Sequence, residues 1–280
     1  MLYRFAASII CFILIYGADV SAQDNPYPWL DEYDSSDAIV ERIAVPDGYK
    51  RVNPMKGTFA HWLQHLPLKE DGSTLMLYNG DRKDNQNHHY AIVNIDRSEQ
   101  NLMQCADAII RLRAEYLYSI GEFDMIHFNF TSGHEAKYTS WIKGYRPKVD
   151  EMRVNWVKNA AADSSYEAFR KYLDSVFMYA GTYSLDNELE KVEDVSKMRI
   201  GDVFIKPGFP GHAIIVVDMA VDKDNGRNLF LLAQGYTPAQ DIHIIKNLHD
   251  EDLNPWYPLD FGDTLKIPEW EFPKEELKRF

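Results

Sequence analysis

Two stretches of the chain repeat apolar residues at the spacing of a helix. The first, CADAIIRLRAEYLYSIGEF, begins at Cys105. Its apolar positions are Ile109, Leu112, Tyr116 and Ile120. This spacing of three to four residues is typical of an amphipathic helix, and Gly121 suits its C-terminal end. The pattern therefore predicts a helix that carries Cys105 in its first turn.

A second helix is predicted to begin near Ser164, because Ser164 and Glu167 have the spacing of a capping box. Its apolar stripe is Phe169, Leu173, Val176 and Phe177. The stripe ends before Gly181, a residue type that commonly follows helices. The aromatic-rich stretch between the two helices, residues 123–157, has no period that assigns it to helix or strand.

The second half of the chain changes to the pattern of strands. Short apolar, β-branched runs occupy residues 199–205, 212–219, 229–234 and 241–245, and the turn-like segments PGFPG, DKDNG and GYTPA separate them. Two earlier runs, residues 75–78 and 89–95, are also expected as strands. Helices followed by successive hairpin strands predict an α+β fold with an antiparallel sheet.

The length, composition and charge of the chain restrict its possible partners and its number of domains. The chain has 280 residues, of which 45% are hydrophobic, with a net charge of −13. An acidic chain repels phosphate backbones and anionic lipid, so we expect no nucleic-acid partner. No linker or repeat divides residues 23–280, which are expected to form a single domain.

The N-terminal residues have the features of a secretory signal. Arg4 precedes an apolar run at residues 5–16, and Val20-Ser21-Ala22 resembles a cleavage site. A run of 12 residues is shorter than the roughly 20 that a membrane-spanning helix needs. We therefore expect residues 1–22 to be a signal peptide, the protein to be secreted or periplasmic, and no stable membrane span to remain after cleavage. A retained N-terminal anchor is the alternative.

Cleavage after Ala22 would leave Cys105 as the one cysteine of the mature chain. Such a cysteine is a buried apolar residue, an intermolecular disulfide partner or a reactive thiol. The start of a helix favours the thiolate that nucleophilic attack requires. His212 follows a Gly/Pro turn and opens a β-branched strand, a rigid position that suits a general base. A histidine that merely caps the turn is the alternative.

This pairing of a helix-start cysteine with a later GD…GH strand resembles the NlpC-type and CHAP-type amidohydrolases, a papain-like superfamily. The resemblance implies a papain-like core in which the Cys105 helix packs on the sheet. It implies Cys105 as nucleophile, His212 as base, and Gln234, on the next strand, as the residue that orients His212. The 107 residues between Cys105 and His212 exceed the usual spacing, which implies an inserted helical lobe at about 121–198.

The segments QCADAIIRLRAEYL, WIKGYRP, GTYSL, IGDVFIKPGFPGHAIIVVD, LLAQGYTPAQDIHII and PEWEF together resemble a family of exported bacterial proteins that is defined only as a domain of unknown function. This likeness covers nearly the whole mature chain and implies no particular activity.

Two residues compete for the role of orienting His212. A hairpin turn at residues 222–228 would fold Gln234 back beside His212, where a cross-strand contact forms. Asp218 lies on the same strand as His212 but six residues further along, roughly 20 Å away in an extended strand. The hairpin therefore favours Gln234.

Other side chains are candidates for weaker roles. Trp141, Tyr145 and Arg146 suit substrate contact, because aromatic rings stack on sugars and Arg binds carboxylates; packing of the inserted lobe is the alternative. The aromatic closing segments, PWY and PEWEF, are expected to anchor the C-terminal tail. The adjacent histidines at 88 and 89 match no metal-ligand spacing, and no nucleotide motif occurs, so neither a metal nor a cofactor is expected.

The sequence thus predicts a secreted cysteine amidohydrolase or peptidase with a Cys105–His212–Gln234 arrangement. Its expected partner is a peptide or cell-wall substrate, and cell-wall peptides are chosen by analogy with the superfamily. The alternative is a catalytically inactive module of the same fold that binds glycan or peptide.

Overall fold

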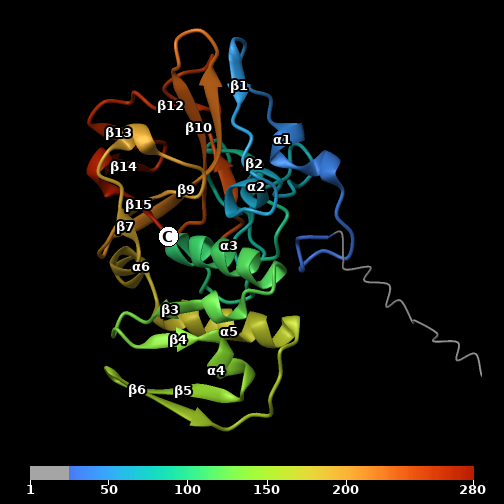
Figure 1. Cartoon of the computed structure of the whole chain (residues 1–280), viewed down its shortest axis with the longest axis vertical. Helices are drawn as coiled ribbons and strands as arrows, with labels where there is room; N and C mark the ends of the chain where they lie inside the picture. The colour runs from blue at the N-terminus through green and yellow to red at the C-terminus, as the bar shows by residue number, and fades with distance from the viewer. Residues whose placement is uncertain (1–24) are drawn as a thin grey trace, which may run out of the picture.

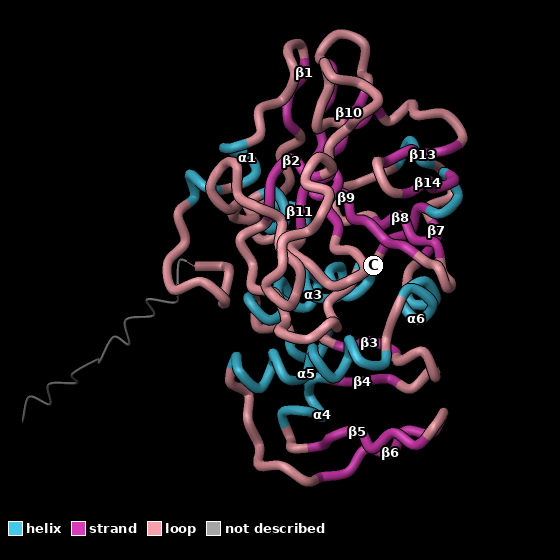
Figure 2. The backbone as a smooth tube through the Cα atoms, turned by 180° about the vertical axis from the view of Figure 1, so that it is seen from behind, coloured by secondary structure: helices cyan, strands magenta, loops and turns pink. Residues whose placement is uncertain are grey.

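A computed structural model of the protein describes residues 25–280. The signal peptide expected at residues 1–22 lies outside the described residues. Figure 1 shows the described chain as a sheet-containing body and a smaller lobe, with α3 between them. The view from behind in Figure 2 has the same arrangement.

The main body is built on an antiparallel sheet of nine strands. Seven of them lie in the order β2-β11-β10-β9-β8-β15-β7, while β1 pairs with β9 and β12 pairs with β10. Their bounds are β1 Tyr49–Arg51, β2 His89–Ile92, β7 Glu190–Lys191, β8 Val203–Lys206, β9 His212–Asp222, β10 Asn228–Gln234, β11 His243–Ile245, β12 Tyr257–Pro258 and β15 Leu277–Arg279. The mixed helix-and-sheet class and its antiparallel sheet agree with the sequence prediction.

The hairpin of β9 and β10 is the centre of this sheet, and it confirms the predicted turn at residues 222–228. Both strands are almost wholly buried, which explains their continuous apolar sequence. A register shift lies between Leu231 and Leu232, which pair with Asp218 and Val216. This bulge breaks the alternation of side chains along β9 between His212 and Asp218.

Within residues 25–280, six α-helices accompany the strands. They are α1 Ile39–Arg42, α2 Phe59–Gln64, α3 Cys105–Ser119, α4 Tyr138–Ile142, α5 Tyr166–Tyr179 and α6 Thr182–Glu188. The predicted helix at Cys105 is α3, which packs against β9 and β10. Ile120, which the pattern assigned to its apolar stripe, lies at the C-cap and is 46% exposed.

The second predicted helix is α5, and its predicted apolar stripe is buried. Its N-cap is Ser165 rather than Ser164, because the Ser165 hydroxyl accepts from the Ala168 backbone N–H. The first strand of the second half begins at Val203 instead of residue 199. Asp202 accepts a hydrogen bond from the Arg199 backbone N–H, and this contact closes a turn ahead of the strand. Residues 75–78 form only isolated bridges, to Arg82 and Gln240.

The smaller lobe contains α4, α5 and two hairpins. The hairpins are β3 His127–Asn129 with β4 Glu135–Lys137 and β5 Tyr145–Asp150 with β6 Arg153–Lys158. These elements fall within the lobe expected at about 121–198, but the hairpins make it mixed rather than helical. Buried polar contacts join the lobe to the body: the Tyr166 hydroxyl on α5 donates to Glu115 on α3 at 2.8 Å.

A further hairpin, β13 Thr264–Ile267 with β14 Trp270–Pro273, precedes β15. Its aromatic side chains were expected to anchor the tail. Phe272 is fully buried, which fits that expectation. Trp270 lies beside His212 instead, with the two ring centroids 5.3 Å apart.

The start of α3 and the end of β10 approach each other at Gly235. A Cβ atom on Gly235 would lie 2.7 Å from the Gln104 carbonyl oxygen and 2.9 Å from the Ala108 Cβ. Such distances are far below van der Waals contact, so only glycine fits here. The absence of a side chain therefore sets how closely the helix start can lie to the strand end.

We expect Gly235→Ala to lower the free energy of unfolding by about 1–3 kcal/mol, because the added methyl must displace the helix backbone. Gly181→Ala is the matched control: nothing lies within 4 Å of the position that its Cβ would take. The control substitution should lower the free energy of unfolding by less than about 1 kcal/mol. Urea unfolding of both variants measures the difference, and equal losses would contradict the close approach.

Candidate active site

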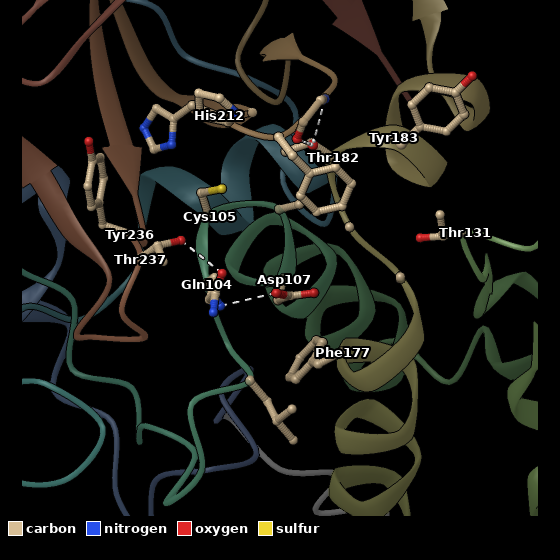
Figure 3. Close-up of a pocket in the computed structure, with 18 of the residues that line it drawn as sticks. Gln104, Cys105, Asp107, Thr131, Phe177, Thr182, Tyr183, His212, Tyr236 and Thr237 are labelled. Carbon is tan, nitrogen blue, oxygen red and sulfur yellow. Dashed lines mark hydrogen bonds between the residues drawn. The ribbon is translucent and has the colours of Figure 1, made fainter. Parts of the chain in front are cut away.

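A cleft of about 570 Å³ lies where the main body meets the lobe. Its walls come from the start of α3, the end of α5, the start of α6, the β8–β9 turn and the segment after β10. Cys105 and His212 both line it, as do Tyr236, Thr237 and Trp270. Figure 3 shows Cys105 at the helix start with His212 and Tyr236 close by. The structure therefore brings together two residues that are distant in the sequence.

Cys105 is the first residue of α3, and its side chain is nearly buried, with 6% of the residue exposed. The backbone N–H groups of Ala106, of Ala213 and of Cys105 itself favour the thiolate. Burial acts more strongly in the opposite direction, and the Asp107 carboxylate adds to it, so the pKa of the Cys105 thiol is raised to about 11. At neutral pH the thiol is therefore protonated in this conformation.

Asp107 lies in the first turn of α3, where it accepts a hydrogen bond from the Gln104 backbone N–H at 3.1 Å. This contact stabilises the helix start. The side chain is buried, and burial raises the pKa of Asp107 to about 8. Its effect on the neighbouring Cys105 is to disfavour the thiolate.

His212, the first residue of β9, is 2% exposed. Aromatic rings surround it: the centroids of Tyr236, Trp270 and Phe272 lie 4.9, 5.3 and 5.9 Å from its own. Burial lowers the pKa of His212 to about 4, although the hydrogen bond that its ring donates to Gln234 and the charge of Glu269 oppose this shift. The imidazole is therefore neutral at pH 7 and able to accept a proton.

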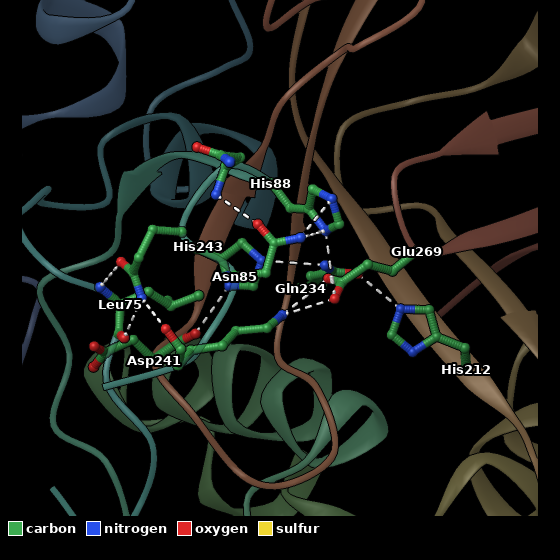
Figure 4. A network of polar contacts seen from close by, with 11 residues as sticks. Leu75, Asn85, His88, His212, Gln234, Asp241, His243 and Glu269 are labelled. Atoms are coloured by element: carbon green, nitrogen blue, oxygen red, sulfur yellow. Dashed lines mark hydrogen bonds and ion pairs between the residues drawn. The ribbon is translucent and has the colours of Figure 1, made fainter. Parts of the chain in front are cut away.

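Gln234, the last residue of β10, contacts His212 directly. Its Oε1 lies 2.7 Å from His212 Nε2, and the residue is 1% exposed. An amide oxygen only accepts, so Nε2 carries the imidazole proton and Nδ1 is left with its lone pair. Figure 4 shows this contact within a larger polar network.

Asp218, the competing candidate, faces other partners. Its carboxylate forms an ion pair with Arg51 at 3.1 Å and accepts a hydrogen bond from the Gln64 side chain. It does not line the cleft. Gln234 is therefore the one of the two that reaches the imidazole.

The thiol and the imidazole share the cleft without a direct hydrogen bond. Among the hydrogen bonds of residues 25–280, none joins Cys105 Sγ to the His212 ring, whose side-chain partner is Gln234. A rotation about the Cα–Cβ bond of Cys105 is the simplest motion that redirects Sγ.

Gln104 links the helix start to the segment after β10. Its Oε1 accepts a hydrogen bond from the Thr237 hydroxyl at 2.8 Å. Thr237 and Tyr236 follow directly after Gln234 and Gly235, so the GYTPA turn supplies one wall of the cleft. Sequence reasoning treated this segment only as a turn.

The remaining site candidates lie elsewhere. Trp141 is buried in α4, and the Arg146 guanidinium stacks over its ring at 3.8 Å. Tyr145 begins β5. None of the three lines the cleft, and the stacked pair packs within the lobe. The apolar groups that do lie at the cleft and remain exposed are Met178, Tyr183 and Phe209, which sequence reasoning did not identify.

Residues 25–280 contain no group of three or more His, Cys, Asp or Glu side chains arranged to hold a metal ion. No helix in that range has the length and apolar character to cross a membrane.

The fold and the cleft define a mixed α+β domain with a buried cysteine, histidine and glutamine at the junction of helix and sheet. Residues 39–279 match the family described as Domain of unknown function (4846), and the chain belongs to this family. No curated protein and no solved structure matches the chain.

The buried thiol gives a testable pH dependence. Labelling of Cys105 by iodoacetamide should be slow at pH 7 in the folded protein and should rise with pH toward about 11, because only the thiolate reacts. Asp107→Asn should lower the apparent pKa of Cys105, because it removes the neighbouring negative charge. The asparagine keeps a side-chain oxygen that can accept the hydrogen bond from the Gln104 backbone N–H. Peptide mass spectrometry locates and quantifies the label.

Asp124→Asn provides the control, because the same chemical change occurs at an exposed residue outside the cleft. It should leave the apparent pKa of Cys105 unaltered. An unchanged or higher pKa in Asp107→Asn would show that this carboxylate does not disfavour the thiolate.

Proposed function

We propose that the protein is an exported cysteine amidohydrolase or peptidase that acts through Cys105, His212 and Gln234. The observation that carries this proposal is the placement of a thiol and a glutamine-bound imidazole in one cleft. The proposal includes a papain-like core, which the helix-start cysteine and strand-start histidine support.

In the proposed first step, His212 Nδ1 takes the proton of the Cys105 thiol while Sγ attacks the carbonyl carbon of an amide. Because the thiol and the imidazole are both neutral near pH 7, the proton transfer accompanies the attack rather than preceding it. The backbone N–H of Cys105, at the start of α3, is the candidate donor to the developing oxyanion.

In the second step, the C–N bond breaks, and the imidazolium returns its proton to the leaving amine. The acyl group remains on Cys105 as a thioester. Water then attacks the thioester carbon and gives its proton to His212, and the acid product leaves as the thiol is restored. Gln234 holds the imidazole in the Nε2–H tautomer throughout.

The proposed substrate class is a peptide amide of the bacterial cell wall. It rests on the signal-like residues 1–22 and on the resemblance to NlpC-type enzymes. The exposed apolar residues at the cleft, including Phe209 at 98% exposure, offer contact surface for such a chain.

A binding module without turnover is the second candidate. The observation that favours it is the burial of Cys105, which keeps the thiol protonated. The two candidates differ in one outcome: a binding module retains its peptide unchanged, and Cys105→Ala binds it as well as the wild type does.

We expect purified cell-wall stem peptides to release new amino groups when incubated with the protein. Cys105→Ala should lower the rate at least about 10³-fold, because it removes the nucleophile. Binding of the same peptides by both proteins, with no amine released by either, would contradict the amidase and support the binding module.

Gln234→Ala should lower the rate roughly 10- to 100-fold, because His212 loses the partner that fixes its tautomer. It should also lower stability by about 1–3 kcal/mol, since buried polar groups lose a partner. Asp218→Asn is the matched control, as it disturbs an equally buried polar contact away from the cleft. It should cost stability with little change in rate; equal losses of rate in both variants would argue against a specific role for Gln234.

A further inference from the structure

A fourth polar residue lies behind the proposed catalytic group. His243 is fully buried on β11 and is the cross-strand partner of Gln234 on β10. The two side chains meet at 3.1 Å, between Gln234 Nε2 and His243 Nε2. Figure 4 shows His243, Gln234 and His212 in a row, with Asp241 beside the first of them.

The far side of the His243 ring contacts the main chain. Its Nδ1 lies 3.1 Å from the backbone carbonyl oxygen of Asp241. That carbonyl is firmly placed, because the Asp241 side chain is buried in ion pairs with Lys69 at 3.0 Å and Arg97 at 2.7 Å. The same carboxylate accepts from the Met76 backbone N–H.

This geometry determines where each proton lies. A backbone carbonyl only accepts, so His243 Nδ1 carries a proton. Burial lowers the pKa of His243 to about 3, so the ring is neutral and its Nε2 has a lone pair. That lone pair requires a donor, which is the amide nitrogen of Gln234.

The same constraint passes to His212. Once the Gln234 nitrogen donates to His243, the amide oxygen must face His212, where it accepts from Nε2–H. The opposite amide orientation would place two acceptors, His243 Nε2 and Gln234 Oε1, against each other. The Asp241 carbonyl therefore fixes the tautomer of His243, which fixes the orientation of the Gln234 amide, which in turn fixes the tautomer of His212.

We propose that His243 is a positioning residue that fixes the Gln234 amide and, through it, the tautomer of His212. Its effect on turnover rests on the proposed function. Its effect on the two imidazole rings does not, and the ring nitrogens therefore provide a readout that is independent of activity.

The wild-type protein alone provides the first test. With ¹⁵N-labelled histidine, the ring nitrogen chemical shifts should identify His243 as the Nδ1–H tautomer and His212 as the Nε2–H tautomer. The two rings should thus hold opposite tautomers. A protonated Nε2 on His243, or the same tautomer on both rings, would overturn the proposal without any variant.

Two substitutions then separate positioning from packing. His243→Asn keeps a donor for the Asp241 carbonyl but removes the acceptor that Gln234 uses, whereas His243→Gln places an amide oxygen where that acceptor lies. We expect the His212 nitrogen shifts to move toward a mixture of tautomers in His243→Asn and to return toward wild-type values in His243→Gln. Unchanged His212 shifts in a folded His243→Asn variant would overturn the proposal.

Turnover distinguishes this inference from the proposed function. If the protein hydrolyses amides, His243→Asn should lower kcat roughly tenfold and His243→Gln should restore most of it, with KM little changed. If the wild type hydrolyses none while the tautomers respond as expected, the proposed function fails and the positioning role stands. If amides are hydrolysed and His243→Asn retains wild-type kcat and His212 shifts, the positioning role fails alone.

Discussion

The close approach of the backbone at Gly235 to the backbone at Gln104 determines the site. It holds the first turn of α3 against the end of β10, at a distance that no side chain at Gly235 would permit. Cys105 follows Gln104, and Gln234 precedes Gly235, so both residues are positioned by the same contact. The hairpin then places His212 beside Gln234. The thiol and the imidazole share a cleft because two backbone segments are packed without an intervening side chain.

The second physical feature is the burial of the polar groups. Burial raises the pKa of the Cys105 thiol and lowers the pKa of the imidazoles of His212 and His243, so all three are neutral near pH 7. Hydrogen bonds satisfy the interior row of amide and imidazole groups from His212 to the Asp241 carbonyl. A buried, fully hydrogen-bonded row of this kind favours a single arrangement of its protons. The row extends from the interior of the sheet to His212 at the wall of the cleft.

Much of this architecture was predictable because its signals are local. Periodicity identified α3 with Cys105 in its first turn, and turn residues identified the hairpin that brings Gln234 to His212. His243 was missed because its relation to Gln234 depends on the register of β11, which the sequence does not specify. The effect of Asp107 on Cys105 depends on burial, a tertiary property. Trp141 and Arg146 showed that residues suited to ligand contact also pack well against each other.

The proposed role of Cys105 as a nucleophile served by His212 is tested most directly by trapping an acyl-enzyme. The protein would be mixed with cell-wall stem peptides, quenched in acid within the first turnover, and analysed by peptide mass spectrometry. We expect an acyl group on the Cys105 peptide that hydroxylamine removes, as it does from thioesters, and that is absent from a His212→Ala variant. Amide hydrolysis that continues in Cys105→Ala, with no adduct on the wild-type cysteine, would show that Cys105 is not the nucleophile.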